Sequence, residues 1–280
     1  MKGMRWPLVW AVVFLAGCAG KPGLVDRGSY RVDVSRQAPS AFPRINTLVI
    51  HYTAGDFDSS LATLTGPDVS AHYLIPAQPP RVGGKPVIWQ LVPEGQLAWH
   101  AGVSYWRGYT HLNSTSVGIE LENSCWHPVA AGLGTGKRFA PFSAPQIAVL
   151  KTLAREIIAR YHIPPQNVVA HADIAPQRKD DPGPLFPWQQ LARQGIGAWP
   201  DPQRVQFYLQ GRARNAAVDS QPLLALLARY GYQLAPGMTD AQQRRVITAF
   251  QMHFRPARYD GEADAETQAI AEALLEKYRQ

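Results

Sequence analysis

The sequence has 280 residues, of which 46% are hydrophobic and 18% are charged, and its formal net charge is +7. This length suits two domains of ordinary size, and the hydrophobic share excludes a disordered chain. The positive charges are spread along the chain without a basic run, which argues against a nucleic-acid partner and favours an anionic surface or polymer.

Residues 1–17 have the pattern of a secretory signal peptide. Lys2 and Arg5 give a positive start, the apolar run WPLVWAVVFLAG (6–17) follows, and small residues precede Cys18. A run of this length makes about 18 Å of helix, shorter than the ~30 Å hydrocarbon core of a bilayer. We therefore expect cleavage and not a spanning helix, and loss of Lys2 and Arg5 would lower the net charge of +7 by two, to +5.

The segment LAGC (15–18) resembles the lipobox of bacterial lipoproteins, in which cleavage leaves the cysteine, here Cys18, as a lipid-modified N-terminus. Ala19 stands where an aspartate would resemble the inner-membrane retention signal, so the resemblance implies a lipid anchor in the outer membrane, facing the periplasm. The alternative is a buried cysteine after an uncleaved helix. With Cys18 lipidated, Cys125 has no partner for an intramolecular disulfide, and we expect a buried thiol or a spare metal ligand there.

Residues 18–43 are polar with scattered glycine and proline, which predicts a lipidated tether and an entry segment. Short β-branched or aromatic runs bounded by turn formers then predict strands at residues 45–53, 71–76, 87–92, 116–123 and 167–171.

A helix is predicted at residues 143–162, with Ser143 as its cap and apolar side chains recurring on one face. The expected fold class is α/β (α+β), with a mixed central β-sheet flanked by helices, over a catalytic domain of residues 44–200.

After Trp199 and Pro200 the pattern becomes helical. Three runs separated by glycine and proline, at residues 220–232, 239–254 and 263–278, predict a small three-helix domain over residues 201–280. The phrases AFQ and DG resemble a three-helix peptidoglycan-binding module. A core of this size needs its leucines and phenylalanines in any case, so a purely structural role stays open.

Two histidines each end the apolar run of a predicted strand, and strand ends mount metal ligands on a rigid base. They are His51, after the run LVI, and His171, after NVVA. One such histidine alone would more often be structural. Asp181 follows in HADIAPQRKDDPGP (171–184), whose prolines and glycine exclude a regular helix, and two imidazoles with one carboxylate are a usual protein share of a catalytic zinc site. Asp173 and Asp180 compete for the carboxylate role, and Asp173 is also a candidate cap for the turn after His171.

Five blocks in order carry a family resemblance: HYTAG (51–55), SAHYLI (70–75), AWHAG (98–102), NSTSVGIELEN (113–123) and the 171–184 segment. Together they resemble the zinc-dependent N-acetylmuramoyl-L-alanine amidases, a family that shares its fold with peptidoglycan recognition proteins and a phage lysozyme. The match runs from about residue 44 to residue 188.

The resemblance implies one zinc ion held by His51, His171 and Asp181, with two catalytic residues beside it. Glu120 would be the general base and then acid, and Lys179 would stabilise the oxyanion. The resemblance selects Glu120 over Glu122, which periodicity cannot do. Taken alone, Glu120 would be an exposed strand carboxylate and Lys179 a surface charge paired with Asp180.

Tyr52, Thr53, Trp99 and His100 are candidates for substrate contacts, although Trp99 alone would more often be a core residue. The implied reaction is hydrolysis of the amide bond between N-acetylmuramic acid and L-alanine in peptidoglycan or its fragments. The alternatives are a peptidoglycan-binding protein without activity and a zinc hydrolase of another cell-wall amide. No protein partner is indicated.

Overall fold

The computed structural model describes residues 23–124 and 139–278, and the chain divides into two compact units, residues 1–42 and 43–280. In the first unit, β1 (Leu24–Asp26) and β2 (Arg31–Asp33) pair as an antiparallel hairpin. Gly28 makes the turn with a φ of 85°, and its N–H donates to Asp26 Oδ1 at 2.8 Å. The polar sequence of the predicted tether did not reveal this hairpin. The predicted signal peptide with Cys18, and also Cys125, lie outside the described residues.

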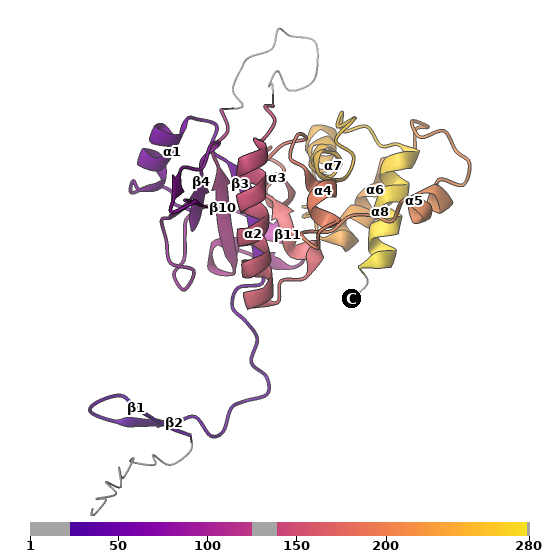
Figure 1. Cartoon of the computed structure of the whole chain (residues 1–280). Helices are drawn as coiled ribbons and strands as arrows, with labels where there is room; N and C mark the ends of the chain where they lie inside the picture. Colours follow the sequence, from indigo (N-terminus) through magenta and orange to yellow (C-terminus); the bar gives the residue numbers. More distant parts are fainter. Residues whose placement is uncertain (1–22, 125–138, 279–280) are drawn as a thin grey trace, which may run out of the picture. The chain divides into compact units, whose positions relative to one another are not determined.

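A five-stranded mixed sheet forms the centre of the second unit, which confirms the predicted fold class (Figure 1). Its strand order is β11-β3-β10-β4-β7, and every pair is parallel except β4 with β7. Each strand falls within one of the predicted runs: β3 (Thr47–Tyr52), β4 (Tyr73–Ile75), β7 (Trp89–Gln90), β10 (Ser116–Leu121) and β11 (Val168–Ala170).

The central strands are buried almost throughout, as near-continuous apolar runs in a covered parallel sheet should be. The predicted helix is α2 (Ala144–Tyr161), which packs across β3 and β4. Ser143 caps it by accepting the Gln146 N–H at 3.2 Å, as predicted. The helix ends at His162, whose φ of 53° is left-handed.

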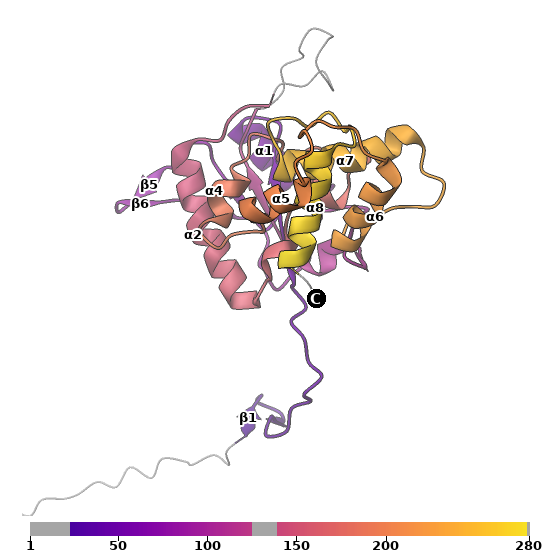
Figure 2. The same cartoon turned by 90° about the vertical axis from the view of Figure 1, so that its right-hand side faces the viewer.

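The remaining elements include the three predicted C-terminal helices, α6 (Ser220–Tyr230), α7 (Asp240–Phe254) and α8 (Ala265–Lys277). In Figure 2, α8 lies close to α5 and α6, and it packs against both. The sequence patterns did not reveal the shorter elements: α1 (Phe57–Leu64), α3 (His171–Ile174), α4 (Trp188–Ala192), α5 (Pro202–Leu209), β5 (Arg81–Val82), β6 (Lys85–Pro86), β8 (Tyr105–Trp106), β9 (Tyr109–Thr110) and the 3₁₀ turns Leu112–Ser114 and Pro165–Asn167.

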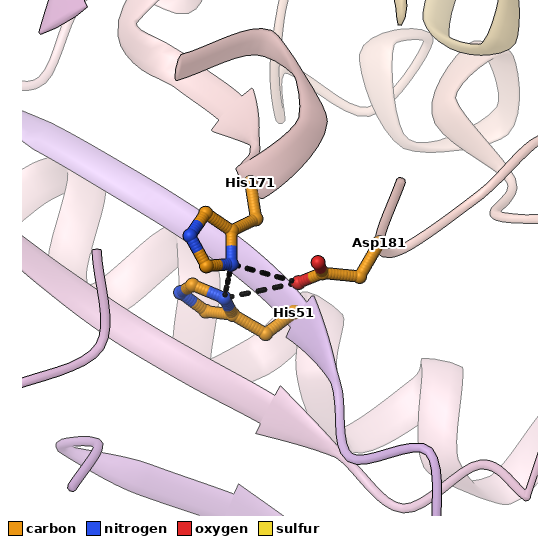
Figure 3. A group of neighbouring side chains, drawn as sticks. All are labelled: His51, His171 and Asp181. Atoms are coloured by element: carbon orange, nitrogen blue, oxygen red, sulfur yellow. Dashed lines mark hydrogen bonds and ion pairs between the residues drawn. The ribbon is translucent and has the colours of Figure 1, made fainter. Parts of the chain in front are cut away.

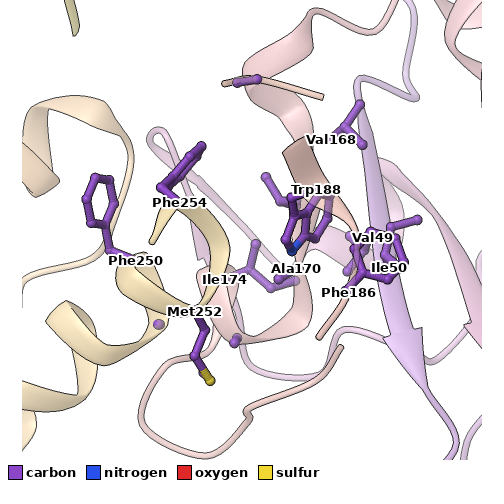
Figure 4. Packing of buried hydrophobic residues seen from close by; sticks show 14 of the residues in the cluster. Val49, Ile50, Val168, Ala170, Ile174, Phe186, Trp188, Phe250, Met252 and Phe254 are labelled. Atoms are coloured by element: carbon purple, nitrogen blue, oxygen red, sulfur yellow. The ribbon is translucent and has the colours of Figure 1, made fainter. Parts of the chain in front are cut away.

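Residues before and after position 200 share one hydrophobic core. A single cluster of buried side chains runs from Ile45 to Leu274. Figure 4 shows where it passes from the sheet to the C-terminal helices, with Ile174 and Trp188 lying between the strands and α7. The C-terminal helices therefore pack against the short helices that follow the sheet, with α7 in contact with α3 and α4. Among the described residues, no helix has the length and hydrophobicity needed to cross a bilayer.

Candidate metal and catalytic site

Three side chains from separate elements converge at the carboxyl ends of β3 and β11. His51 is in β3, His171 begins α3 directly after β11, and Asp181 lies in the loop that follows. The two Nδ1 atoms are 2.9 Å apart, and each lies 3.1 Å from Asp181 Oδ2 (Figure 3). All three residues are buried. The convergence predicted from the sequence is therefore present.

The outer nitrogen of His171 has a backbone partner. His171 Nε2 lies 3.2 Å from the carbonyl oxygen of Ala101, which can only accept a hydrogen bond. The proton of a neutral His171 ring is therefore on Nε2, and the lone pair of Nδ1 faces the other two side chains.

His51 Nε2 lies at the end of a chain of hydrogen bonds, called here the relay, that runs from Ser116 through His100. The Ser116 hydroxyl donates to the Leu112 carbonyl at 2.5 Å, and its oxygen lies 3.1 Å from His100 Nε2. Since that hydroxyl has only one proton, it accepts from His100 Nε2–H, and His100 Nδ1 then accepts from His51 Nε2–H at 3.0 Å. The lone pair of His51 Nδ1 consequently also faces the centre.

These lone pairs and the Asp181 carboxylate fit a metal ion. Two nitrogen lone pairs and a carboxylate oxygen within about 3 Å repel one another unless a cation lies among them. Two imidazoles with one carboxylate form a common protein ligand set that leaves a coordination position open. The group is thus a possible metal site of the open, catalytic type.

Burial and mutual charge keep these groups in the protonation states that metal ligands need. Burial, followed by the charge of His171, lowers the pKa of His51 to about 4 against the opposing effect of Asp181. Burial would raise the pKa of Asp181, but the charges and hydrogen bonds of His171 and His51 outweigh it and hold that pKa far below its usual value. At neutral pH, His51 is neutral and Asp181 is ionised.

Glu120 stands beside this group on the neighbouring strand. It is the register partner of His51 in the parallel pair of β10 with β3. The side chain is half-buried, and its Oε2 is covered without a hydrogen-bond partner in the described part of the chain. Burial raises the pKa of Glu120 to about 8, with the charge of Asp181 adding to the effect and that of Lys179 opposing it.

Glu122 has a different environment. The strand ends at Leu121, and Glu122 Oε2 accepts the Ala77 N–H at 2.7 Å. Its backbone carbonyl accepts from Gln146 at 3.0 Å. Glu122 therefore connects the end of β10 to α2 and to the segment after β4, whereas Glu120 faces the site.

One cavity of about 480 Å³ gathers the predicted site residues. Those that line it are Tyr52, Thr53, Trp99, His100, Glu120, His171, Lys179 and Asp181. His51, 1% exposed, lies just behind the wall against His171. The helix α1 contributes Ser59, Ser60 and Thr63 to the lining, which no sequence pattern indicated.

The four candidates for substrate contacts differ in exposure. Trp99 is 65% exposed, so the interpretation of this residue as part of the core is wrong. His100 is buried and already hydrogen-bonded to His51, so it supports a ligand as well as lining the cavity. Tyr52 donates its hydroxyl to Asp180 Oδ1 at 2.8 Å, and Thr53 donates to the Gly55 carbonyl at 3.1 Å.

Arg178 and Asn113 fix the loop that supports both histidines, and no sequence pattern indicated this role. Arg178 Nη2 donates to the carbonyls of Ala101 and Val103 at 2.6 and 2.8 Å. Asn113 Oδ1 accepts the N–H groups of His100 and Ala101. Both residues stand in the quoted blocks, but their partners are remote in sequence and cannot be read from it.

The remaining acids of the loop have other partners. Asp173 Oδ2 accepts the Ala170 N–H at 2.8 Å, so Asp173 caps the turn that contains His171 and is not a metal ligand among the three converging side chains. Lys179 is exposed beside the site, where its charge lowers the pKa of both His51 and Glu120. The backbone N–H of Lys179 donates to the Ala175 carbonyl at 3.0 Å, and this hydrogen bond holds the backbone from which the Lys179 side chain extends.

Comparison with known proteins agrees with this geometry. Residues 41–184 match the family model described as N-acetylmuramoyl-L-alanine amidase. The chain is 68% identical over 280 residues to N-acetylmuramoyl-L-alanine amidase AmiD of Escherichia coli K12, and the alignment covers 100% of both chains.

Solved structures are similar over most of the chain. The complex of E. coli AmiD with the substrate anhydro-N-acetylmuramic acid-L-Ala-D-gamma-Glu-L-Lys matches with a TM-score of 0.88 and 69% identity, over 93% of this chain and 100% of that one. AmpDh3 of Pseudomonas aeruginosa in complex with anhydromuramic pentapeptide matches with a TM-score of 0.79 and 42% identity, over 91% of this chain and 98% of that one. The chain therefore belongs to the N-acetylmuramoyl-L-alanine amidase family and is an enzyme of that class.

Proposed function

We propose that the metal is zinc, one ion per chain, and that the enzyme hydrolyses the amide bond between N-acetylmuramic acid and L-alanine in peptidoglycan or its fragments. The observation that carries this proposal is the meeting of His51, His171 and Asp181 beside Glu120 in one cavity. Two nitrogen ligands and one oxygen ligand suit zinc better than calcium or magnesium, which prefer oxygen alone. Bound zinc would supply Lewis-acid polarisation of water and of the amide carbonyl.

The proposed proton path runs through Glu120. Its carboxylate takes a proton from the attacking water as the new carbon–oxygen bond forms, and then gives that proton to the amide nitrogen as the carbon–nitrogen bond breaks. The products are the carboxylic acid of the lactyl group and the free amino group of L-alanine. A covered Oε2 without another partner suits this exchange, because no competing hydrogen bond from the described residues holds the carboxylate away.

Lys179 is the proposed stabiliser of the developing negative charge. The carbonyl oxygen becomes negative when water adds to the amide, and a fixed ammonium group beside it lowers the energy of that state. Lys179 lines the same cavity as Glu120. It lies two residues before Asp181, in a loop held by backbone hydrogen bonds.

The relatives support the choice of substrate. Both solved complexes described above contain anhydromuramic acid joined to a peptide, and both match more than nine-tenths of this chain. We propose that Tyr52, Thr53, Trp99 and His100, which line the cavity, contact such a muropeptide.

The test is digestion of purified muropeptides, with mass analysis of the products. We expect free stem peptide with an L-alanine amino terminus, loss of the reaction with a chelator, and recovery with zinc. Shortened peptides still joined to the sugar would instead indicate hydrolysis of another cell-wall amide. Muropeptide binding without any cleavage, in zinc-loaded protein, would indicate a binding protein.

We also propose that the enzyme is a lipoprotein of the outer membrane, facing the periplasm and anchored through fatty acyl chains on Cys18. The support is the LAGC segment after a positively charged and apolar leader. Radiolabelled palmitate should enter the wild-type protein and the matched Cys125→Ser control, but not Cys18→Ser, which should move to the soluble periplasmic fraction. Membrane association of Cys18→Ser equal to wild type would contradict the anchor.

A further inference from the structure

Asp173 is a buried carboxylate two residues after the metal-site residue His171. Its exposed fraction is 0%, and it accepts three hydrogen bonds. One comes from the Ala170 N–H at 2.8 Å; the others come from Tyr232, whose hydroxyl donates at 2.5 Å, and from His253 Nδ1 at 2.7 Å. The last two residues belong to the C-terminal helical segment.

The hydrogen bond to Ala170 gives Asp173 control over the turn between β11 and α3. That turn determines the direction in which His171 leaves the strand. The next residue, Ala172, donates its N–H to the carbonyl of Asp181 at 2.9 Å. Displacement of this turn would therefore move His171 and the backbone of Asp181 together.

The two C-terminal partners of Asp173 are themselves held firmly. The His253 ring, 2% exposed, is stacked on Trp188 at 3.9 Å and on Phe254 at 4.0 Å between ring centroids. The Tyr232 ring, 1% exposed, packs edge-on against Trp106 at 5.1 Å. Neither ring can follow a displaced carboxylate without disturbing the core.

We propose that the C-terminal helices position the metal site: Tyr232 and His253 hold Asp173, and Asp173 fixes the turn that presents His171 and supports Asp181. A buried carboxylate is costly unless its hydrogen bonds are made, so loss of either partner favours relaxation of the turn. Figure 4 shows the packing between α7 and the residues around α3, with Met252 and Phe254 of α7 on the side of Ile174. Asp173, Tyr232 and His253 are positioning residues in this account, and the inference rests on the proposed function for the identity of the metal.

The test compares two conservative changes in the full chain. Tyr232→Phe removes only the hydroxyl that donates to Asp173, and the matched control is Tyr230→Phe. Tyr230 is equally buried, in the same segment, and makes no described hydrogen bond with Asp173. The measurements are zinc affinity by chelator competition, the visible spectrum of the cobalt-substituted protein, and the melting temperature without metal.

We expect Tyr232→Phe to weaken zinc binding about ten-fold, the low end of the effect of outer-shell partners, and to change the cobalt spectrum. Tyr230→Phe should bind zinc within about two-fold of wild type, with an unchanged spectrum, even where both variants lower the melting temperature. For His253, the change to asparagine keeps a donor near Nδ1 and should retain more zinc affinity than the change to leucine.

Wild-type zinc affinity and an unchanged cobalt spectrum in Tyr232→Phe would overturn this inference and leave the proposed function standing. Failure of the wild-type protein to bind zinc would overturn the proposed function, and this inference with it.

Discussion

Glu120 and His51 are opposite each other in the parallel pair of β10 with β3. The backbone hydrogen bonds of the sheet fix the separation of these two residues, and each is the next-to-last residue of its strand. Ligand sites in open α/β sheets lie outside the carboxyl ends of the strands. The sheet thus supplies a rigid frame on which a proton-transfer group and a metal-site residue keep their relative positions.

Glu120→Gln is expected to keep zinc and lose catalytic rate. The amide preserves the shape of the side chain but cannot take up a proton, and general acid–base groups contribute about 10²- to 10⁴-fold in rate. Metal analysis and steady-state kinetics on a muropeptide would check this. The matched control is Glu122→Gln, whose oxygen can still accept the Ala77 N–H, and it should stay within a few-fold of wild type. Equal losses in the two variants would argue against a catalytic role specific to Glu120.

Lys179→Ala is expected to lower kcat by about 10²- to 10³-fold, the range for loss of one oxyanion-stabilising donor. Zinc content should not change, because Lys179 is exposed and is not part of the possible metal site. Lys85→Ala, at an exposed lysine of β6, serves as the control. A Lys179→Ala enzyme with a raised KM and normal kcat would mean that the ammonium binds substrate without stabilising the transition state.

Gly118→Ala should weaken zinc binding without touching a proposed ligand. A Cβ at Gly118 would lie 2.5 Å from the His100 ring, so that ring must shift, and the shift would disturb its hydrogen bond with His51. Loss of an outer-shell partner typically lowers metal affinity 10- to 100-fold. Gly95→Ala is the control, because a Cβ there meets no atom within 4 Å. If Gly118→Ala bound zinc as tightly as Gly95→Ala, the relay from Ser116 through His100 would have no part in holding the metal.

The hydrophobic runs predicted the five strands of the sheet because parallel strands buried on both faces are apolar almost throughout. Local signals also placed α2 and the C-terminal helices: Ser143 caps α2, and glycine and proline separate the three C-terminal helical runs. These predictions need only neighbouring residues.

The supports of the site could not be predicted in this way. His253 lies 80 residues from Asp173, and Arg178 lies 77 residues from Ala101. Each residue type is common in loops and helices, and only the folded chain shows which carbonyl or carboxylate it meets. The helix α1 begins with a recognisable cap, Asp56, but its eight residues are too few for a clear helical period.

Glu94 should stabilise the fold in a pH-dependent way. Burial would raise its pKa, but hydrogen bonds from Arg160, Tyr73 and Tyr161 outweigh burial and lower it. Since the folded-state pKa lies below that of the unfolded chain, about 4.3, the stabilisation is complete above that value and is lost as pH falls through the folded-state pKa.

Glu94→Gln should therefore lower the free energy of unfolding at pH 7 by about 1.5 to 3 kcal/mol, the range for hydrogen bonds to a charged group. The difference from wild type should shrink towards pH 3 in denaturant titrations. Glu156→Gln, at an exposed position of α2, should show no such trend. A difference between Glu94→Gln and wild type that is constant from pH 7 to pH 3 would exclude the ionised carboxylate as its source.

The most direct test of the metal site is anomalous diffraction at the zinc absorption edge from crystals of active, zinc-loaded enzyme. We expect one strong peak about 2.0 to 2.2 Å from His51 Nδ1, His171 Nδ1 and Asp181 Oδ2, and no peak there in Asp181→Ala. An anomalous peak bound to other side chains, or active crystals without a peak among these three atoms, would contradict this expectation.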